Sequence, residues 1–164
     1  MPKKKIYLDT TVISHLRHED RPDWMADTLE LWEILKRGEY DVHISDVVMI
    51  ELMRCPEPKQ TELLAFLDEI QYTEIAVESN EKILAIADQI KKLTVIPPKS
   101  ENDRRHIAAA LYSGCNIIVS WNFNHFVTQK TIDGVRQICF SNHISPIVDI
   151  YSPTILLERS GHNG

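Results

Sequence analysis

The sequence predicts a single α/β domain, a three-layer α/β/α sandwich in which helices cover both faces of a central parallel sheet. Short apolar runs of strand length alternate with amphipathic segments of helical length along most of the 164 residues. The run NIIVS at 116–120 is almost wholly apolar, as a strand covered on both faces should be. No repeat, low-complexity tract or linker interrupts the alternation. We therefore expect one domain over 1–158, followed by a flexible tail over 159–164.

Five segments have the character of strands. In chain order they are KKIYL at 4–8, DVHIS at 41–45, YTEIAV at 72–77, NIIVS at 116–120 and PIVDI at 146–150. In a parallel sheet the carboxyl ends of the strands meet at one edge, and ligands of open α/β sheets bind there. Residues that follow directly after these strands are therefore the first candidates for a site.

The segments between the strands show helical spacing and recognisable ends. Ser45 or Asp46 can cap one helix, which Pro56 ends, and Gly114 closes another. In chain order the expected helices cover 25–35, 45–54, 59–70, 80–93, 101–114 and 131–138.

Composition narrows the functional class. The formal net charge of −6 argues against a generally basic nucleic-acid coat but leaves a local basic patch possible. Cys55, Cys115 and Cys139 lie far apart and form no CxxC, which argues against a zinc ribbon or a disulfide framework and favours a reducing compartment such as the cytoplasm. No run approaches the ~20 apolar residues of a membrane span, and no apolar segment follows MPKKK, so neither a membrane anchor nor a secretory signal is expected.

Three acids break the amphipathic pattern. Asp9 ends the first strand, and Glu51 lies four residues after Val47, on the apolar side of its helix. Asp103 lies four residues before Ile107 and thus also on an apolar face, in a first turn. Any one of these acids could be a cap-like charge or the partner of an arginine. Together they favour a shared site, where clustered carboxylates need a positive partner such as Mg²⁺.

Longer motifs carry a family resemblance. LDTTVI, SDVVMIEL and NDRRHIAAALYSGCNIIVSWNFNHF, in this order, resemble the successive motifs of PIN-domain ribonucleases, in particular the VapC-type toxins of toxin–antitoxin pairs. The match runs from about Ile6 to Leu157, and SNHISPIVDIYSPTILLE resembles the end of a subgroup with Trp-Asn-Phe where others have an Asp. The resemblance implies a Mg²⁺- or Mn²⁺-dependent endoribonuclease, with RNA as substrate, a cognate antitoxin as partner and a homodimer as a common assembly.

The resemblance also implies roles for individual residues. The family's first three acids fall on Asp9, Glu51 and Asp103, which would hold the cation directly or through water. The fourth acidic position falls on Asn122, which brings no charge, so that one metal, two metals or impaired catalysis all stay open. Thr11 stands where many members have Asn or Ser. One of the carboxylates, or Asn122, would orient the attacking water.

Several residues near these motifs could contact RNA. Lys99, Arg104 and Arg105 around Asp103 could supply a local positive strip, and Trp121 and Phe123 could stack a base, although a core role is the alternative for at least one of these rings. His15, His18, Arg17 and Arg21 could face phosphates or could equally form a solvated helix face. The candidate substrate contacts are Thr11, Arg17, Arg104, Arg105, Trp121 and His125.

Two further features have more than one interpretation. We expect His106 to form a hydrogen bond or to pack, rather than to bind a metal. The apolar helices around 29–35 and 63–67 are plausible homodimer faces, but burial in the core would explain them equally well.

Three functional hypotheses result. The first is a metal-dependent ribonuclease, the toxin of a toxin–antitoxin pair. The second is a PIN fold whose acid set has decayed at Asn122 and which binds RNA or protein without cutting. The third is a phosphate-accepting signalling domain built on Asp9, but such domains need a Lys after a later strand, and Ser120-Trp121-Asn122 offers none.

Overall fold

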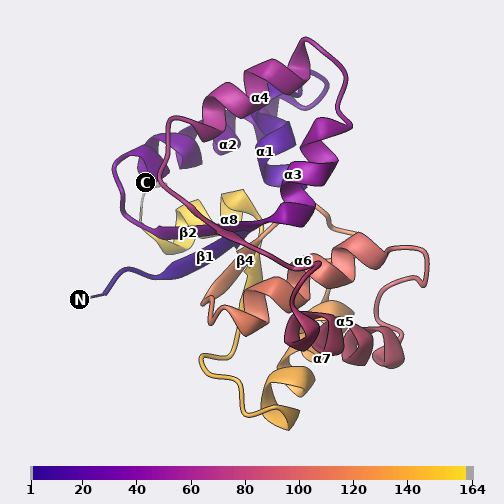
Figure 1. Cartoon of the computed structure of the whole chain (residues 1–164). Coiled ribbons are helices and arrows are strands. Elements are labelled where there is room, and N and C mark those ends of the chain that lie inside the picture. The colour runs from indigo at the N-terminus through magenta and orange to yellow at the C-terminus, as the bar shows by residue number, and fades with distance from the viewer. Residues whose placement is uncertain (1, 162–164) are drawn as a thin grey trace.

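A computed structural model describes residues 2–161 and places a five-stranded parallel sheet at the centre of the chain (Figure 1). The sheet order is β3-β2-β1-β4-β5, and each neighbouring pair is parallel. The strands are β1 (Lys5–Leu8), β2 (Asp41–Ser45), β3 (Thr73–Ile75), β4 (Ile117–Val119) and β5 (Asp149–Tyr151). The first strand in the sequence is therefore the central one, and its carboxyl end lies between those of β2 and β4.

Helices cover both faces of this sheet, which confirms the three-layer α/β/α architecture (Figure 1). Helices α1 to α4 and α8 pack on one face, whereas α5, α6 and α7 pack on the other. Their bounds are α1 (Thr10–Ser14), α2 (Pro22–Lys36), α3 (Asp46–Met53), α4 (Lys59–Leu67), α5 (Glu81–Leu93), α6 (Glu101–Tyr112), α7 (Gln129–Ser141) and α8 (Pro153–Arg159), with a 3₁₀ turn at His15–Arg17 after α1.

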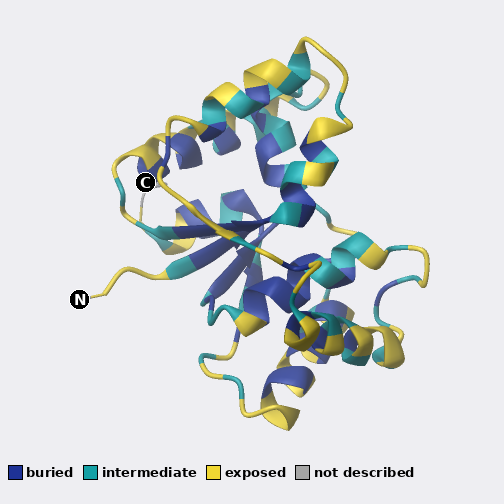
Figure 2. Ribbon diagram, in the orientation of Figure 1, coloured by how far each residue is buried: buried dark blue, intermediate teal, exposed yellow. Residues whose placement is uncertain are grey.

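Side chains alternate between the two faces of each strand and so contribute to two separate hydrophobic cores. In β1, Ile6 and Leu8 point into the core under α2 and α4, while Tyr7 points into the core under α5 and α6. Ile118 and Val119 of β4 divide in the same way. Figure 2 shows most of the central strands in the colour of buried residues. Full burial of each such aliphatic side chain contributes about 1.5–3 kcal/mol, which explains why the apolar strands occupy the middle of the sheet.

Two helices were missed by the sequence prediction. Helix α1 follows directly after β1, and α8 follows β5; they are five and seven residues long. A helix this short shows too little of the 3.6-residue repeat to be recognised from spacing. The helix expected from residue 25 begins at Pro22, since proline favours the first turn, and the last strand lies at 149–151 rather than 146–150.

The apolar faces at 29–35 and 63–67 belong to the core. Leu31, Trp32 and Leu35 of α2 are at most 3% exposed, and Leu63 and Leu67 of α4 at most 1%. These side chains pack under the sheet, so they do not form a homodimer surface.

The C-terminal residues match the expected tail only in part. Helix α8 extends to Arg159, so the expected tail begins with a helical residue, and residues 162–164 lie outside the described part of the chain. None of the helices between residues 2 and 161 has the length and apolar character needed to cross a membrane.

Candidate active site at the carboxyl edge of the sheet

Asp9 is a buried carboxylate at the carboxyl end of the central strand. It caps α1, where Oδ1 accepts from the backbone N–H of Val12 at 3.3 Å and from Thr11 Oγ1 at 2.6 Å. Its other oxygen accepts from Ser120 Oγ at 2.6 Å. Burial raises the pKa of Asp9 above its ordinary value, although His106 and these donors act in the opposite direction.

Glu51 lies on α3, the helix that follows β2. Its Oε1 accepts from Thr10 Oγ1 at 2.6 Å and lies 2.7 Å from Nε2 of His106. Partial burial works against the charged form, but His106, Thr10 and the Asn102 side chain outweigh it, so the pKa of Glu51 is lowered. Glu51 is therefore held as an anion, in contrast to Asp9.

His106 is held from behind by a buried polar chain. Its Nδ1 lies 2.6 Å from the Tyr7 hydroxyl, which lies 2.7 Å from Ser45 Oγ. Burial raises the pKa of Tyr7 well above its ordinary value, so the phenol keeps its proton. Because an ionised carboxylate only accepts, Nε2 of His106 donates to Glu51. The structure thus shows His106 in a hydrogen-bonding role.

Asp103 forms a second acid–histidine pair. Its Oδ2 lies 2.7 Å from Nδ1 of His125, and both side chains are partly buried. His125 is in turn positioned by Asn122, whose Oδ1 accepts from the backbone N–H groups of Asn124 and His125 at 3.0 and 2.8 Å. The Asn122 side-chain carbonyl thus shapes the loop after β4.

These contacts join the three acids into one system at the carboxyl edge of the sheet. Asp9 is bonded to Ser120, whose Oγ also accepts from Asn122 N at 2.9 Å, and Asn122 leads through His125 to Asp103. Thr10, the neighbour of Asp9 in the chain, reaches Glu51. We call Asp9, Glu51, Asp103 and their hydrogen-bond partners the acidic network.

The acidic network offers suitable donors for a hard divalent cation, but not a preassembled cage. Carboxylate oxygens are the ligands that Mg²⁺ and Mn²⁺ prefer, and the buried Asp9 carboxylate accepts from the neutral donors Thr11 and Ser120. Within residues 2–161, however, no three acid, histidine or cysteine side chains stand close enough together to hold a metal. Glu51 and Asp103 bond their histidines through one oxygen each, Oε1 and Oδ2, so the second oxygen of each carboxylate could face an ion while the histidine stays in place.

Two of the residues expected to contact substrate are buried. Arg104 is 4% exposed, and its guanidinium donates to the carbonyls of Pro97 and Pro98. Trp121 is 3% exposed, and its indole N–H donates to Thr28 Oγ1 at 2.9 Å. Their roles are to hold the loop before α6 and to fill the core, so neither can contact RNA in this conformation.

The other expected contacts lie nearer to solvent. Arg17 is paired with Glu62 at 3.2 Å, and Arg105 with Glu78 at 2.6 Å and with Glu101 at 3.0 Å. Arg105 also lines a hollow of about 500 Å³ beside Asp103, together with Arg54 and Lys99. Thr11 and His125 belong to the acidic network itself.

Sequence reasoning missed Ser120 and Thr10 as members of the network. Ser120 follows directly after β4, as Asp9 follows directly after β1, and the register pairs the last residues of these strands, Leu8 and Val119. The signal was therefore a small hydroxyl directly after an apolar strand, but only the knowledge that β1 and β4 are neighbours gives it meaning.

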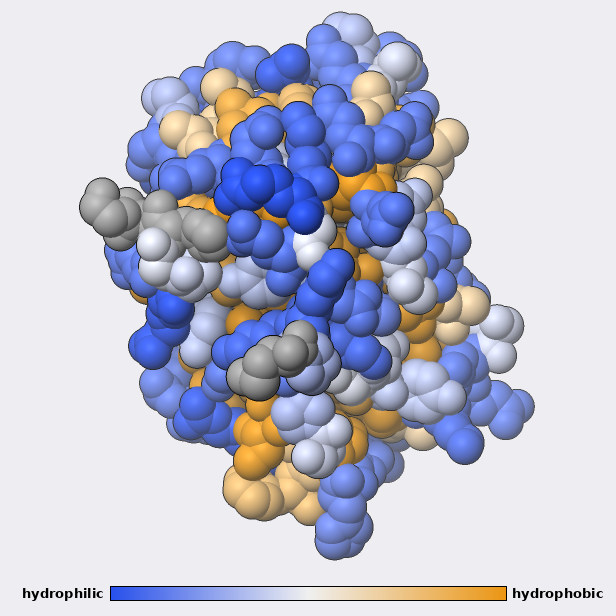
Figure 3. Space-filling view, turned by 90° about the vertical axis from the view of Figure 1, so that its left-hand side faces the viewer, coloured by the Kyte–Doolittle hydropathy of each residue, from blue (hydrophilic) through white to orange (hydrophobic). Residues whose placement is uncertain are grey.

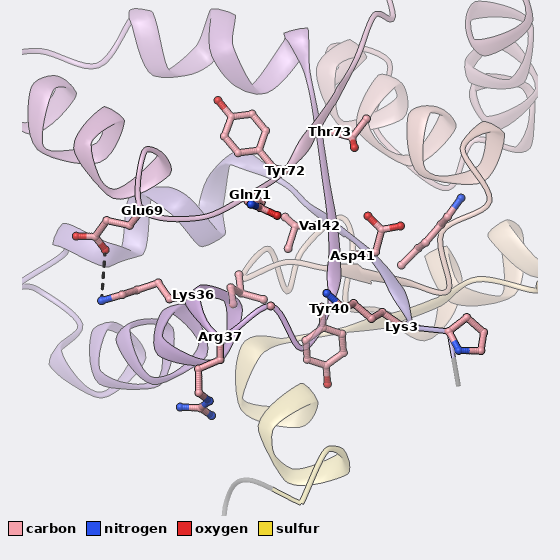
Figure 4. Close-up of a pocket in the computed structure, with 14 residues that line it drawn as sticks. Lys3, Lys36, Arg37, Tyr40, Asp41, Val42, Glu69, Gln71, Tyr72 and Thr73 are labelled. Carbon is pink, nitrogen blue, oxygen red and sulfur yellow. Dashed lines mark ion pairs between the residues drawn. The ribbon is translucent and has the colours of Figure 1, made fainter.

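A cavity lies at the opposite, amino edge of the sheet (Figure 4). It encloses about 920 Å³, and its lining includes Lys3, Lys36, Tyr40 and Asp41. Lys36 is already paired with Glu69 at 3.8 Å. Hydrophilic residues cover most of this side of the molecule (Figure 3). Of the two acids in its lining, Asp41 and Glu69, the second is already paired with Lys36, so the acidic network is the better candidate for chemistry.

The acids thus gather at the carboxyl edge of a parallel α/β/α sandwich, which is where open α/β sheets bind their ligands. The sequence matches the PIN domain over residues 6–125, most of its length, and the chain therefore belongs to the PIN domain family. PIN domains are generally nucleases.

A solved structure supports the same fold. The chain is similar to a chain in the crystal structure of VapBC2 from Rickettsia felis, which is bound to a DNA fragment from the VapBC2 promoter. The TM-score is 0.54. The similarity covers 90% of this chain and 98% of that one at 14% identity, so it concerns the fold alone. A search of curated proteins gave no match.

Proposed function

We propose that this chain is a Mg²⁺- or Mn²⁺-dependent endoribonuclease, the toxin component of a type II toxin–antitoxin system. The observation that carries the proposal is the convergence of Asp9, Glu51 and Asp103 on one hydrogen-bonded network, within a PIN domain. These residues come from three different elements, and acids so placed have no evident structural purpose in common.

The three carboxylates would hold the cation. A bound divalent ion supplies an activated water and neutralises charge on the phosphate. The remaining work falls to the chain: Ser120 and Thr11 keep the buried Asp9 carboxylate in place, and His106 orients Glu51. Asn122 has its carbonyl oxygen engaged by two backbone N–H groups, so its part is to position His125 rather than to orient water.

RNA phosphates would be held by local positive charge. Arg54 and Lys99 line the hollow beside Asp103, and Arg105 would join them once it is released from Glu78 and Glu101, which line the same hollow. Since the whole chain carries a net charge of −6, binding should depend on these few cations and weaken steeply with salt. Arg17 is a further candidate at the same end of the sheet, once it is released from Glu62.

The proposal includes partners and location. A toxin of this kind pairs with a cognate antitoxin, and the similarity to VapBC2 makes a VapB-like protein the one to look for. A homodimer and a cytoplasmic location complete the proposal; a short reading frame encoding a DNA-binding protein beside this gene would support the pairing.

The direct test is cleavage of RNA in Mn²⁺ or Mg²⁺. Asp9→Asn and Asp103→Asn should abolish cleavage, while Asp88→Asn, a change at an exposed acid on α5, should leave it intact. Cleavage that survived both network substitutions would refute the residue assignment.

A catalytically weakened PIN domain that binds RNA or protein is the second candidate. It is favoured by the Asn122 side-chain carbonyl, which already accepts from backbone N–H groups, and by the two acid–histidine pairs. Calorimetry separates the two: Mn²⁺ binding that Asp9→Asn removes supports the nuclease, and the absence of any heat of binding supports the weakened domain.

A further inference from the structure

Four rings from three separate segments pack in a continuous series beside the acidic network. We call them the aromatic ladder; its members are His15, Trp24, Trp121 and Phe123. Trp24 of α2 and Trp121 stack with ring centroids 4.6 Å apart and planes 9° apart. Phe123 lies 5.4 Å from Trp24, and His15 lies 5.5 Å from the same ring. Trp24 therefore joins the whole ladder together.

The ladder has a buried end and an open end. Trp121 is 3% exposed and bonded to Thr28, so it forms the floor. Phe123 is 44% exposed although it packs against Trp24 and Trp121. The outermost ring of an ordered aromatic series is thus presented to solvent, with its position already set by the rings beneath it.

Positive charge adjoins the ladder. The guanidinium carbon of Arg21 lies 3.6 Å from the centroid of the Trp24 ring, while the same side chain reaches Asp23 at 3.2 Å. The His18 ring lies 4.3 Å from that of His15. A flat apolar surface beside a guanidinium matches the two halves of a nucleotide, its base and its phosphate.

The ladder is joined directly to the acidic network. The backbone N–H of Trp121 donates to Thr11 Oγ1 at 2.9 Å, and that hydroxyl donates to Asp9 at 2.6 Å. Asn122 stands between the two ladder rings in the chain and positions His125. A ligand seated on Phe123 would therefore lie next to the proposed site of cleavage.

We infer that Phe123, backed by Trp24 and flanked by Arg21, positions the substrate by stacking on the face of an unpaired base. The inference rests on the proposed function, because it names a residue that would hold the RNA for cleavage at the acidic network. Only an unpaired, unstacked base can offer its face to a protein ring, since bases inside a duplex are stacked on both sides. An apolar peptide would have no use for the guanidinium beside the rings.

The test is the affinity of the intact protein for a fluorescent 12-nucleotide RNA without self-pairing, measured by anisotropy in EDTA so that no cleavage occurs. Phe123→Ala and Phe123→Leu should weaken binding about ten-fold, the loss expected for one base–ring stack, and Phe123→Trp should restore it. The loss should be similar at about 50 and 200 mM salt, because stacking, unlike phosphate contact, releases no counterions.

The matched control is Phe140→Ala. Phe140 is also an exposed phenylalanine, at 70%, but it lies on α7 and makes no contact with the ladder. Its removal should leave the affinity unchanged. A duplex of the same length should bind at least ten-fold more weakly than the single strand and should not respond to Phe123→Ala.

Three results would overturn the inference: wild-type protein that does not bind the single strand, equal affinity for strand and duplex, or an affinity that Phe123→Ala leaves unchanged. The nuclease proposal fails separately. If no metal supports cleavage but binding depends on Phe123, the ladder stands without the nuclease. If cleavage requires Asp9 but binding ignores Phe123, the nuclease stands without the ladder.

Discussion

Ser120→Ala tests whether the acidic network is held together as the structure indicates. Ser120 Oγ donates to Asp9 Oδ2 at 2.6 Å and accepts from the backbone N–H of Asn122 at 2.9 Å, and the residue is fully buried. A hydrogen bond to a charged group contributes about 1.5–3 kcal/mol, and the N–H of Asn122 would lose its partner as well. We expect a loss of about 2–4 kcal/mol in the free energy of unfolding at neutral pH.

This loss should be visible as a fall in Tm, followed by circular dichroism. For a domain of this size 1 kcal/mol corresponds to about 2–4 °C, so a fall near 10 °C is expected. Ser141→Ala, at the exposed end of α7, is the control and should change Tm by no more than about 1–2 °C.

The pH dependence identifies the carboxylate as the cause. The pKa of Asp9 is already raised by burial, and loss of the Ser120 donor should raise it further. The difference between wild type and variant should therefore be full above the folded-state pKa of Asp9 and shrink as the pH falls through it. A deficit that stayed constant down to about pH 4, or no deficit at all, would refute the reasoning.

Three other predictions follow from the same contacts. Asp9→Asn should stabilise the fold at neutral pH by about 0.5–2 kcal/mol, because the raised pKa of Asp9 means that the native state disfavours the anion. This gain in the free energy of unfolding, measured with urea, should vanish as the pH falls below the unfolded-state pKa of the carboxyl group. Destabilisation at neutral pH would contradict the prediction. Glu51→Gln should act in the opposite direction, because the pKa of Glu51 is lowered. The free energy of unfolding should fall by about 1–3 kcal/mol above the unfolded-state pKa of Glu51, and the difference should fade as acid protonates the wild-type residue. A loss that did not depend on pH would point to packing instead. Cys115 is fully buried, and its pKa is raised to about 12. A thiol reagent should therefore modify the partly exposed Cys55 first and reach Cys115 only on unfolding. Equal rates of modification in the native protein, measured by mass spectrometry, would show that the core opens.

The sequence alone was enough for the fold class and for the edge at which the acids gather. Both rest on local patterns: apolar runs such as 116–120 identify strands buried on both faces, and helical spacing places Glu51 and Asp103 on inward faces. Because a parallel sheet collects its carboxyl ends at one edge, an acid directly after β1 and two acids at helix positions facing that edge could be expected to lie together.

The partners of those acids were decided only by the tertiary structure. Ser120 reaches Asp9 because β4 pairs with β1 in one particular register, and His106 reaches Glu51 because α6 packs beside α3. Burial of Arg104 likewise depends on the loop that carries Pro97, and burial of Trp121 depends on α2, which supplies Thr28. Local periodicity specifies which face of an element a side chain occupies, but not what lies opposite, and contacts between residues about a hundred positions apart have no signature in either segment alone.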